Sequence, residues 1–596
     1  MEKFVTTREY SRRLVVYCLL AILAPVYLVN IIPVQQWAHG VPVADSRLNL
    51  WALTHQWKAL PTNPMDIWNG NAFFPAKQTI TGSDHLFTQA LVGLPIYKLT
   101  ENPFLAYHFV LFVGYALGAW GMFLLGLHLF RHGGAALASA IFFTVALPRS
   151  IQAVGHIQIA FQGLMPWSIY FLYRMYHRNN VSATLGFVVS TTLHMLSGWY
   201  MAFFYIFILV IMMPSLALKY RRLNTFYVGI AAVAVVFLLV LPFVLPYLEH
   251  SGGDPEKLTH FSAKISDFFK PASYTVYSRS RQPFWSETTL WMGLTAPITA
   301  LIGLFMRGRP DRTGRTPGIT PFLLLILLGG AFACGAKLPG SVVKILSFGT
   351  LENLPGMAGI RAPARAVFIV IFSLSILFGR AIWLIEKKLI WKYSGRIIAV
   401  LAVALVMVEN FPLMRLRPVE VQVPEIYRWL GSLPEKPVIA ELPCFGDTDL
   451  WAFSADYMMY AALQGHTTVN GYSRFAPSSY YEMSDALKRI PSSSAIKYLK
   501  DAGVDYLVVH PQMYFHHYIR NLFAEMAESS DPVEILNQIT ELSDSHYSQF
   551  ESIEGKIIEQ ECLQSPYLHL IGRYGRSLVF SFNDLLIVKN PSILKQ

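Results

Sequence analysis

Thr225-FYVGIAAVAVVFLLVLPFVLP-Tyr247 is a run of 23 residues without a single charge. A helix of this length, with its rise of about 1.5 Å per residue, can cross the roughly 30 Å hydrocarbon core of a bilayer. Similar apolar runs recur from Leu14 to about Pro412, in a chain that is 54% hydrophobic and only 14% charged. The sequence therefore predicts a polytopic α-helical membrane protein.

We predict about 11 transmembrane helices from these apolar runs. They cover residues 14–33, 104–130, 134–149, 157–174, 181–198, 199–218, 225–247, 288–306, 318–336, 364–385 and 397–414. The first follows a basic start but is long and lacks a small-residue cleavage site, so we interpret it as a retained anchor. We find no internal repeat in this sequence, whereas many secondary transporters carry one.

Basic residues orient the predicted helices. They gather in every second connection, which the positive-inside rule places in the cytoplasm together with the N-terminus. These residues are Lys3, Arg8, Arg12, Arg13, Arg131, Arg174, Arg178, Lys219, Arg221, Arg222, Arg307, Arg309, Arg312, Arg315, Lys387, Lys388, Lys392 and Arg396. Because these basic residues set the orientation of the helices, the net charge of +11 does not indicate a nucleic-acid partner. All the long polar segments then face outward.

Two domains are predicted. Residues 1–414 form the transmembrane domain, which includes a long first outer loop at 35–103, and residues 415–596 form an extracytoplasmic α/β domain. In the second domain, apolar runs and turn residues predict two buried strands, two helices and three short antiparallel strands around a mixed sheet. These elements cover residues 437–443, 504–510, 478–489, 494–501, 568–573, 577–582 and 585–589. Cys444 and Cys562 lie in this domain, but their spacing alone does not show whether they pair.

The first outer loop is the main candidate for function, because carboxylates and imidazoles at the hydrocarbon boundary are costly unless they have a task. Residues 45–57 and 84–97 have apolar side chains at helical spacing, which predicts two helices in the outer interface. Asp45 and Asp84 stand near the starts of these helices. The alternative is that each aspartate only caps its helix.

Seven stretches resemble a large group of mostly uncharacterised bacterial membrane proteins, and the loop arrangement resembles the type C (GT-C) integral membrane glycosyltransferases. The stretches are Asp45-SRLNLW, Asn71-AFFP, Ser83-DHLF, Gly155-HIQ, Ser266-DFF, Arg361-APAR and Asn470-GYS. The resemblance implies a GT-C-like enzyme of the bacterial cytoplasmic membrane. Such an enzyme transfers a sugar from a polyprenyl-phosphate carrier to an acceptor outside the membrane, which here is an unidentified glycan, lipid or protein of the envelope.

The resemblance also implies catalytic roles for the two aspartates. Asp45 falls where GT-C enzymes place an acidic residue that accepts the proton of the acceptor hydroxyl, a general-base task. Asp84, with the adjacent His85, is a candidate second acidic site that positions the acceptor or holds a divalent ion. Only one carboxylate and one imidazole are identified there, so a Mg²⁺ or Mn²⁺ ion is a possibility without a defined ligand set.

The leaving lipid phosphate requires cations or hydrogen-bond donors. Arg361 and Arg365 begin the tenth predicted span four residues apart, on one helix face, and are candidates to hold the phosphate. Arg149 and His156, in a predicted outer turn between spans, are further candidates. The alternatives are snorkelling of the two arginines to the interface and a structural role for the histidine.

Four other residues are candidates for binding the acceptor or the sugar. His55 lies on the first loop helix, His85 follows Asp84, and Glu287 begins the eighth predicted span. Asn470 lies near predicted strand ends in the outer domain, where α/β domains commonly bind ligands. Glu287 is equally explained as an acid favoured by the helix dipole.

Two other functional classes stay open. A transporter or flippase of lipid-linked saccharides would be equally basic inside, but it should carry charges along a path through the membrane. An O-antigen-type ligase or polymerase would also use external arginines, with its large loops late in the membrane region. For the glycosyltransferase, we expect Asp45, Asp84, Arg361 and Arg365 to converge on one outward cavity.

Overall fold

The computed structural model describes residues 15, 19, 32–41, 44–178, 180–248, 259–272, 275–277, 287–306, 318–338, 361–388, 394–413, 421–446, 453–514 and 553–582. The chain divides into two units. Unit 1 contains Met1–Pro42 and Asp84–Val419, and unit 2 contains Val43–Ser83 and Glu420–Gln596. The first polar loop therefore contributes to both units.

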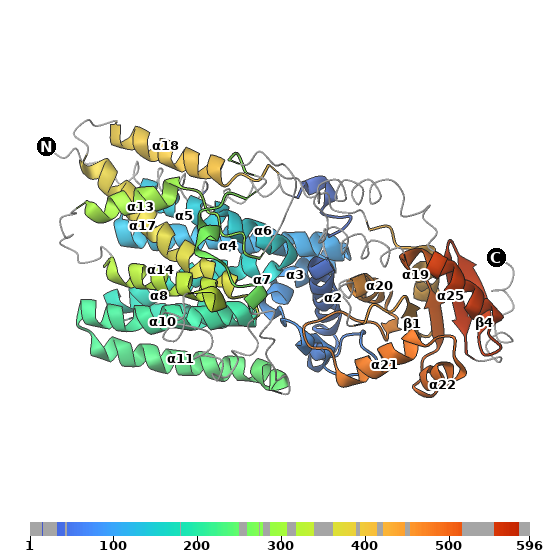
Figure 1. Cartoon of the computed structure of the whole chain (residues 1–596). Helices are drawn as coiled ribbons and strands as arrows, with labels where there is room; N and C mark the ends of the chain where they lie inside the picture. Colours follow the sequence, from blue (N-terminus) through green and yellow to red (C-terminus); the bar gives the residue numbers. More distant parts are fainter. Residues whose placement is uncertain are drawn as a thin grey trace. The chain divides into compact units, whose positions relative to one another are not determined.

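Unit 1 consists of helices (Figure 1). The α-helices are α3 (Phe87–Thr100), α4 (Pro103–Phe130), α5 (Gly133–Val145), α6 (Leu147–Gly155), α7 (Ile157–Ala160), α8 (Leu164–Arg178), α9 (Val181–Met195), α10 (Trp199–Tyr220), α11 (Leu223–Val244), α13 (Thr295–Phe305), α14 (Thr320–Cys334), α17 (Val367–Lys388) and α18 (Ser394–Glu409). The 3-10 helices are η2 (Val34–Gln36), η5 (Phe161–Gly163), η6 (Leu245–Tyr247), η7 (Ile265–Phe268), η8 (Gly335–Lys337) and η10 (Pro363–Ala366).

Five segments of the described chain are long and apolar enough to cross a membrane, and a sixth is the bent pair α5 and α6. The five are Pro103–Phe130, Trp199–Tyr220, Leu223–Tyr247, Thr320–Lys337 and Pro363–Lys388. This confirms a polytopic helical membrane protein. The predicted total of about 11 spans stays a prediction, because α8, α9, α13 and α18 are shorter and most of the first predicted span lies outside the described residues.

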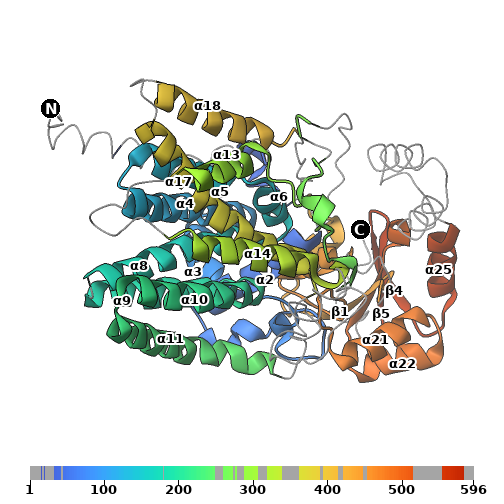
Figure 2. The same cartoon turned by 60° about the vertical axis from the view of Figure 1, so that its left-hand side comes forward.

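Helix α17 is the core of unit 1, since nearly all of it is buried. It packs against α5, α13 and α14, as Figure 2 shows. Small residues permit this close packing: a methyl group built on Gly303 of α13 would lie 2.5 Å from Cβ of Ala381. Helix α11, in contrast, exposes most of its apolar side chains, as expected for a helix that faces lipid.

Two predicted spans are broken in the structure. The span predicted at 134–149 bends by 44° between α5 and α6, where Ala146 is non-helical and Pro148 lies in the first turn of α6. The span predicted at 157–174 consists of α7, η5 and α8. The span predicted at 288–306 begins only at Thr295. Arg149 therefore lies in a helix rather than in a turn, and Glu287 does not begin one.

Unit 2 contains a mixed sheet with strand order β2-β1-β3-β5-β4. The strands β2, β1 and β3 are parallel, whereas β5 runs antiparallel to β3 and to β4. The elements are α2 (Ala44–Ala59), η3 (Pro64–Trp68), η4 (Thr79–Gly82), α19 (Glu425–Ser432), β1 (Val438–Leu442), α20 (Ser454–Gln464), β2 (Thr467–Thr468), α21 (Ser478–Lys488), α22 (Ser493–Asp501), β3 (Tyr506–Val509), η12 (Pro511–Tyr514), α25 (Ile553–Gln564), β4 (His569–Tyr574) and β5 (Ser577–Ser581). This confirms the predicted C-terminal α/β domain.

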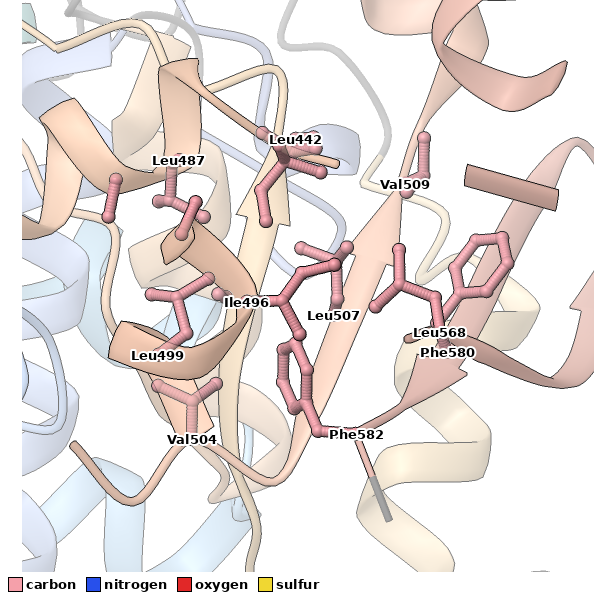
Figure 3. Packing of buried hydrophobic residues seen from close by; sticks show 14 of the residues in the cluster. Leu442, Leu487, Ile496, Leu499, Val504, Leu507, Val509, Leu568, Phe580 and Phe582 are labelled. Carbon is pink, nitrogen blue, oxygen red and sulfur yellow. The ribbon is translucent and has the colours of Figure 1, made fainter. Parts of the chain in front are cut away.

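Side chains alternate between the two faces of the sheet, and both faces are buried. On one face, Ile496 and Leu499 of α22 pack against Leu507 and Phe580 (Figure 3). On the other face, helix α19 covers Ile439 of β1 with Ile426, Tyr427 and Leu430. Cys444 and Cys562 are free thiols near the first of these clusters, so they form no disulfide. The predicted strand at 585–589 lies outside the described residues.

Part of the first loop completes unit 2. Helix α2 packs on α20, with Trp51 in a cluster that includes Met458. Beyond α2, the chain pairs with edge strand β2: the amide of Thr468 donates to the carbonyl of Asn71 at 3.0 Å, and the amide of Phe74 donates to the carbonyl of Thr468 at 3.2 Å. This segment is therefore hydrogen-bonded to the edge of the sheet, although it forms no strand of its own.

Candidate functional site

Asp84 is fixed at the start of helix α10. Its Oδ1 accepts a hydrogen bond from the amide of Trp199 at 2.8 Å, and its Oδ2 accepts one from Nε2 of Gln158 at 2.9 Å. The alternative that Asp84 caps its own helix is wrong, because α3 begins only at Phe87 and no side chain caps its start at Leu86. Asp84 instead stabilises the N-terminus of α10, which carries partial positive charge.

The chain around Asp84 is held by the turn between α9 and α10. Thr88 donates its amide to the carbonyl of Leu196 and its hydroxyl to the carbonyl of Leu193, at 3.0 and 2.7 Å. Nε2 of Gln89 donates to the carbonyl of Ser197 at 2.7 Å. These bonds fix Asp84 relative to the membrane helices.

Burial and the neighbouring groups of Asp84 act on the pKa of its carboxyl in opposite directions. Burial raises its pKa above the usual value, although the hydrogen bond from Trp199 and the nearby charge of Arg365 act in the opposite direction. A raised pKa brings a carboxylate closer to the range in which it can exchange protons at neutral pH.

Arg365 and Glu287 form a buried ion pair. Nε of Arg365 donates to Oε2 of Glu287 at 3.1 Å, and Nη2 donates to Oε1 at 2.5 Å. Both residues are less than a tenth exposed. Burial alone would raise the pKa of Glu287, but the charge and hydrogen bonds of Arg365 lower it well below its usual value. Glu287 is therefore ionised, and its negative charge compensates Arg365.

His156 lies at the junction of this ion pair. Its Nε2 is 2.7 Å from Nη2 of Arg365 and 3.2 Å from Oε1 of Glu287. When Nε2 is unprotonated it accepts from Arg365, and when it carries the proton it donates to Glu287. Nε2 of Gln152 donates to the backbone carbonyl of Glu287 at 3.2 Å. Arg365, Glu287 and His156 are hereafter called the arginine cluster.

Tyr200 connects α10 to the segment that carries both predicted phosphate-binding arginines. Its hydroxyl accepts from the amides of Arg361 and Ala362 at 2.6 and 3.1 Å, and its ring lies 5.0 Å from the guanidinium of Arg365. The prediction that the arginines share one helix face is wrong, because Arg361 is non-helical and Arg365 lies in η10. Arg365 is buried, whereas Arg361 is partly exposed.

Asp45 belongs to unit 2 and lies in the first turn of α2. Its Oδ1 accepts a hydrogen bond from the hydroxyl of Tyr472 at 2.9 Å. The nearby cation Arg47 pairs with Asp456 of α20. The structure thus fixes Asp45 through a neutral donor. Its convergence with Asp84 and the arginines stays a prediction, because these residues belong to different units.

Arg149 does not have the surroundings of a phosphate ligand. It is completely buried, and its Nη2 donates to the carbonyl of Ala160 at 2.9 Å. Its guanidinium also lies 4.5 Å from the ring of Tyr115 and 4.6 Å from that of Phe143. These contacts tie α6 to α4, α5 and α7, so we correct the prediction to a structural role.

Three of the predicted ligand-binding residues also have structural partners. Nε2 of His55 lies 2.8 Å from the carbonyl of Asp66, which joins α2 to η3. Nδ1 of His85 accepts from the amide of Phe87, and burial lowers the pKa of His85 to about 3, so the ring is neutral. Asn470 is completely buried and bonds both the amide and the carbonyl of Glu441 in β1. None of these contacts indicates a sugar ligand.

Gln158 and Tyr200 contact the candidate site residues, but neither of them was assigned a role from the sequence: Gln158 was only placed in the outer turn with Arg149 and His156. Gln158 stands in the quoted stretch Gly155–Gln158, and Tyr200 follows the glycine that precedes α10. A polar residue at a break between apolar runs was the available signal in both cases. Among the described residues, no group of three or more His, Cys, Asp or Glu side chains is arranged to hold a metal ion.

Substitution of Asp84 by alanine is expected to destabilise unit 1 by about 1 kcal/mol, the usual cost of losing a helix cap. Asp84→Asn should cost less, because its Oδ1 can still accept from the amide of Trp199 while Gln158 turns its amide. Thermal unfolding of both variants in nanodiscs checks this. Equal melting temperatures for wild type and Asp84→Ala would contradict the capping role.

The fold of the chain is similar to that of known GT-C glycosyltransferases. Arabinofuranosyltransferase AftD from Mycobacteria matches with a TM-score of 0.54 and 16% identity, over 95% of this chain and 41% of that chain. The chain therefore spans less than half the length of AftD. The Archaeoglobus fulgidus oligosaccharyltransferase matches over 86% of this chain and 71% of its own, at 13% identity and a TM-score of 0.47. ArnT from Cupriavidus metallidurans matches over 97% and 99%, at 13% identity and a TM-score of 0.39.

Of these likenesses, the one to AftD exceeds a TM-score of 0.5 and confirms the predicted GT-C type of fold. Residues 13–408 match the family described as Domain of unknown function (DUF6311), and the chain belongs to this family. No protein of curated function matches the sequence significantly.

Proposed function

We propose that this protein is a membrane glycosyltransferase that moves a sugar from a polyprenyl-phosphate carrier to an acceptor on the outer face of a bacterial cytoplasmic membrane. The observation that carries the proposal is the arginine cluster beside Asp84, within a fold of the GT-C type. A guanidinium next to a carboxylate, at the ends of membrane helices, suits a reaction in which phosphate leaves and a hydroxyl loses its proton.

In this reaction, the acceptor oxygen attacks the anomeric carbon and the bond from that carbon to the phosphate oxygen breaks. The phosphate leaves with the bonding electrons, and a carboxylate takes the acceptor proton. We assign Asp45 as the carboxylate that takes this proton. Its position in the first loop resembles that of the GT-C acidic residue, and its Oδ1 is fixed by Tyr472. Asp84, with both oxygens hydrogen-bonded, orients the site and balances its charge.

The lipid phosphate is assigned to Arg361 and Arg365. Arg361 is the more exposed of the two, and its amide is held by Tyr200, so its guanidinium is carried by a fixed piece of backbone. Arg365 supplies donors in a planar fork that matches phosphate oxygens as well as a carboxylate. In this assignment, Nε2 of His156 accepts a hydrogen bond from Nη2 of Arg365.

The test is transfer of sugar from radiolabelled polyprenyl-phosphate sugars to a cell-envelope extract by the purified full-length protein. The proposal expects transfer with at least one donor. Absence of transfer with every donor, together with uptake of a lipid-linked saccharide into liposomes, would overturn it in favour of a transporter. The product also identifies the sugar and the acceptor class.

A further inference from the structure

The ion pair between Arg365 and Glu287 has the geometry of an anion-binding site that is already filled. Two nitrogens of the guanidinium donate to the two oxygens of one carboxylate, which is the arrangement that arginine also offers to a phosphate. The ring of Tyr200 holds the guanidinium from one side, at 5.0 Å. Arg365 is thus positioned for an anion by contacts that do not involve Glu287.

The stability of the fold does not by itself explain the ion pair between Arg365 and Glu287. A buried ion pair loses most of its Coulomb attraction to desolvation, and apolar residues of similar size are often as stable. Glu287 also lies in a turn rather than in a helix, with Gln152 bonded to its backbone carbonyl. Glu287 therefore starts no helix that its carboxylate would have to cap.

Because of His156, a phosphate can replace Glu287 at Arg365 without leaving a buried polar group unpaired. Its Nε2 is within hydrogen-bond distance of both Arg365 and Glu287. If Glu287 leaves Arg365, the neutral ring tautomer that carries its hydrogen on Nε2 can donate to the carboxylate. If Glu287 stays, an unprotonated Nε2 accepts from Arg365.

We propose that Glu287 competes with the lipid phosphate for Arg365, so that it weakens binding of the carrier product and speeds its release. The inference rests on the proposed function, because the competing phosphate is that of the donor carrier. The donor is a phosphodiester with one negative charge. After transfer the carrier is a phosphomonoester that approaches two, and it would bind a lone arginine more tightly than the donor does. A resident carboxylate offsets this difference.

Binding of undecaprenyl phosphate to the purified full chain in detergent tests the inference, with tryptophan fluorescence as the readout and undecaprenol as the ligand without phosphate. Glu287→Gln is expected to lower the Kd for undecaprenyl phosphate about tenfold, which corresponds to about 1.4 kcal/mol. The Kd for undecaprenol should not change. In the transfer reaction, Glu287→Gln should lower both KM and kcat, because product release becomes slower.

Glu409→Gln is the matched control. Glu409 is also buried, but it accepts from the amides of Leu294 and Thr295 at the start of α13, and its other oxygen accepts from Tyr277. Its substitution should leave the Kd for undecaprenyl phosphate unchanged. The double variant Glu287→Gln, Arg365→Gln should lose the tighter binding, because the gain depends on Arg365.

An unchanged or higher Kd for Glu287→Gln in a folded sample would overturn the inference. Equal gains for undecaprenyl phosphate and undecaprenol would overturn it too, because the effect would then belong to the lipid tail. These binding measurements need no sugar transfer. Tighter phosphate binding without transfer from any donor would support the competition and contradict only the proposed glycosyltransferase activity.

Discussion

Asp45→Asn is expected to reduce glycosyl transfer by at least about 100-fold, the usual contribution of a positioned general base. Asparagine has nearly the same shape and can still accept the hydrogen bond from Tyr472, but its amide cannot take the acceptor proton. The fold of unit 2 should be preserved. Initial rates of sugar transfer, with the melting temperature measured on the same samples, check both expectations.

Asp66→Asn is the matched control for this prediction. Asp66 belongs to the same loop segment in η3, and its carboxylate accepts from Nδ2 of Asn69 within its own turn. Its substitution should leave the transfer rate unchanged. If Asp45→Asn keeps the wild-type rate while Asp84→Asn loses it, the proton goes to Asp84. If both variants keep the rate, neither carboxylate is the base.

Arg365→Gln is expected to lower both stability and transfer. Loss of the guanidinium leaves the ionised Glu287 buried without its cation, which typically costs about 3 to 5 kcal/mol. Transfer by the molecules that stay folded should fall by about 100-fold or more, because charge on the leaving phosphate is no longer compensated. Thermal unfolding in nanodiscs and transfer rates per folded molecule measure the two effects separately.

The double variant Arg365→Gln, Glu287→Gln separates stability from chemistry. Removal of both charges should restore most of the melting temperature, whereas transfer should stay low. Arg380→Gln, on the same helix α17, is the matched control: Nη1 of Arg380 donates to the carbonyl of Gly303 in α13, so its loss should lower stability without lowering transfer per folded molecule. Full transfer activity of the double variant would contradict the phosphate role of Arg365.

Local patterns in the sequence predicted most of the helices and strands, but not which of them pack together. Apolar runs bounded by turn residues predicted β1 and β3, and helical patterns predicted α2, α21 and α22 within a few residues. Strand β2 has only two residues and gives no such signal. The break at Ala146 was hidden because the apolar run continues through it.

The site was harder to predict because its contacts join distant parts of the chain. Asp84 caps a helix that begins 115 residues later, and Glu287 pairs with an arginine 78 residues away. Nothing in the local sequence distinguishes these acids from caps of their own helices. Arg149 was predicted to bind phosphate from an outer turn, because its actual partners are backbone carbonyls and rings, which leave no mark in the sequence near it.

The pairing of Asn71 and Phe74 with strand β2 has a consequence for how this protein is made. The first-loop segment leaves the ribosome long before its partner strand: Asn71 and His466, which bond each other, are 395 residues apart. At typical translation rates this segment waits roughly 20 to 80 s for the rest of its sheet. Until then it is an unpaired chain with apolar residues such as Trp51 and Phe73, the kind of intermediate that binds chaperones. A fragment that begins after the last membrane helix would lack this segment and expose β2 as an open edge, prone to pairing with other chains.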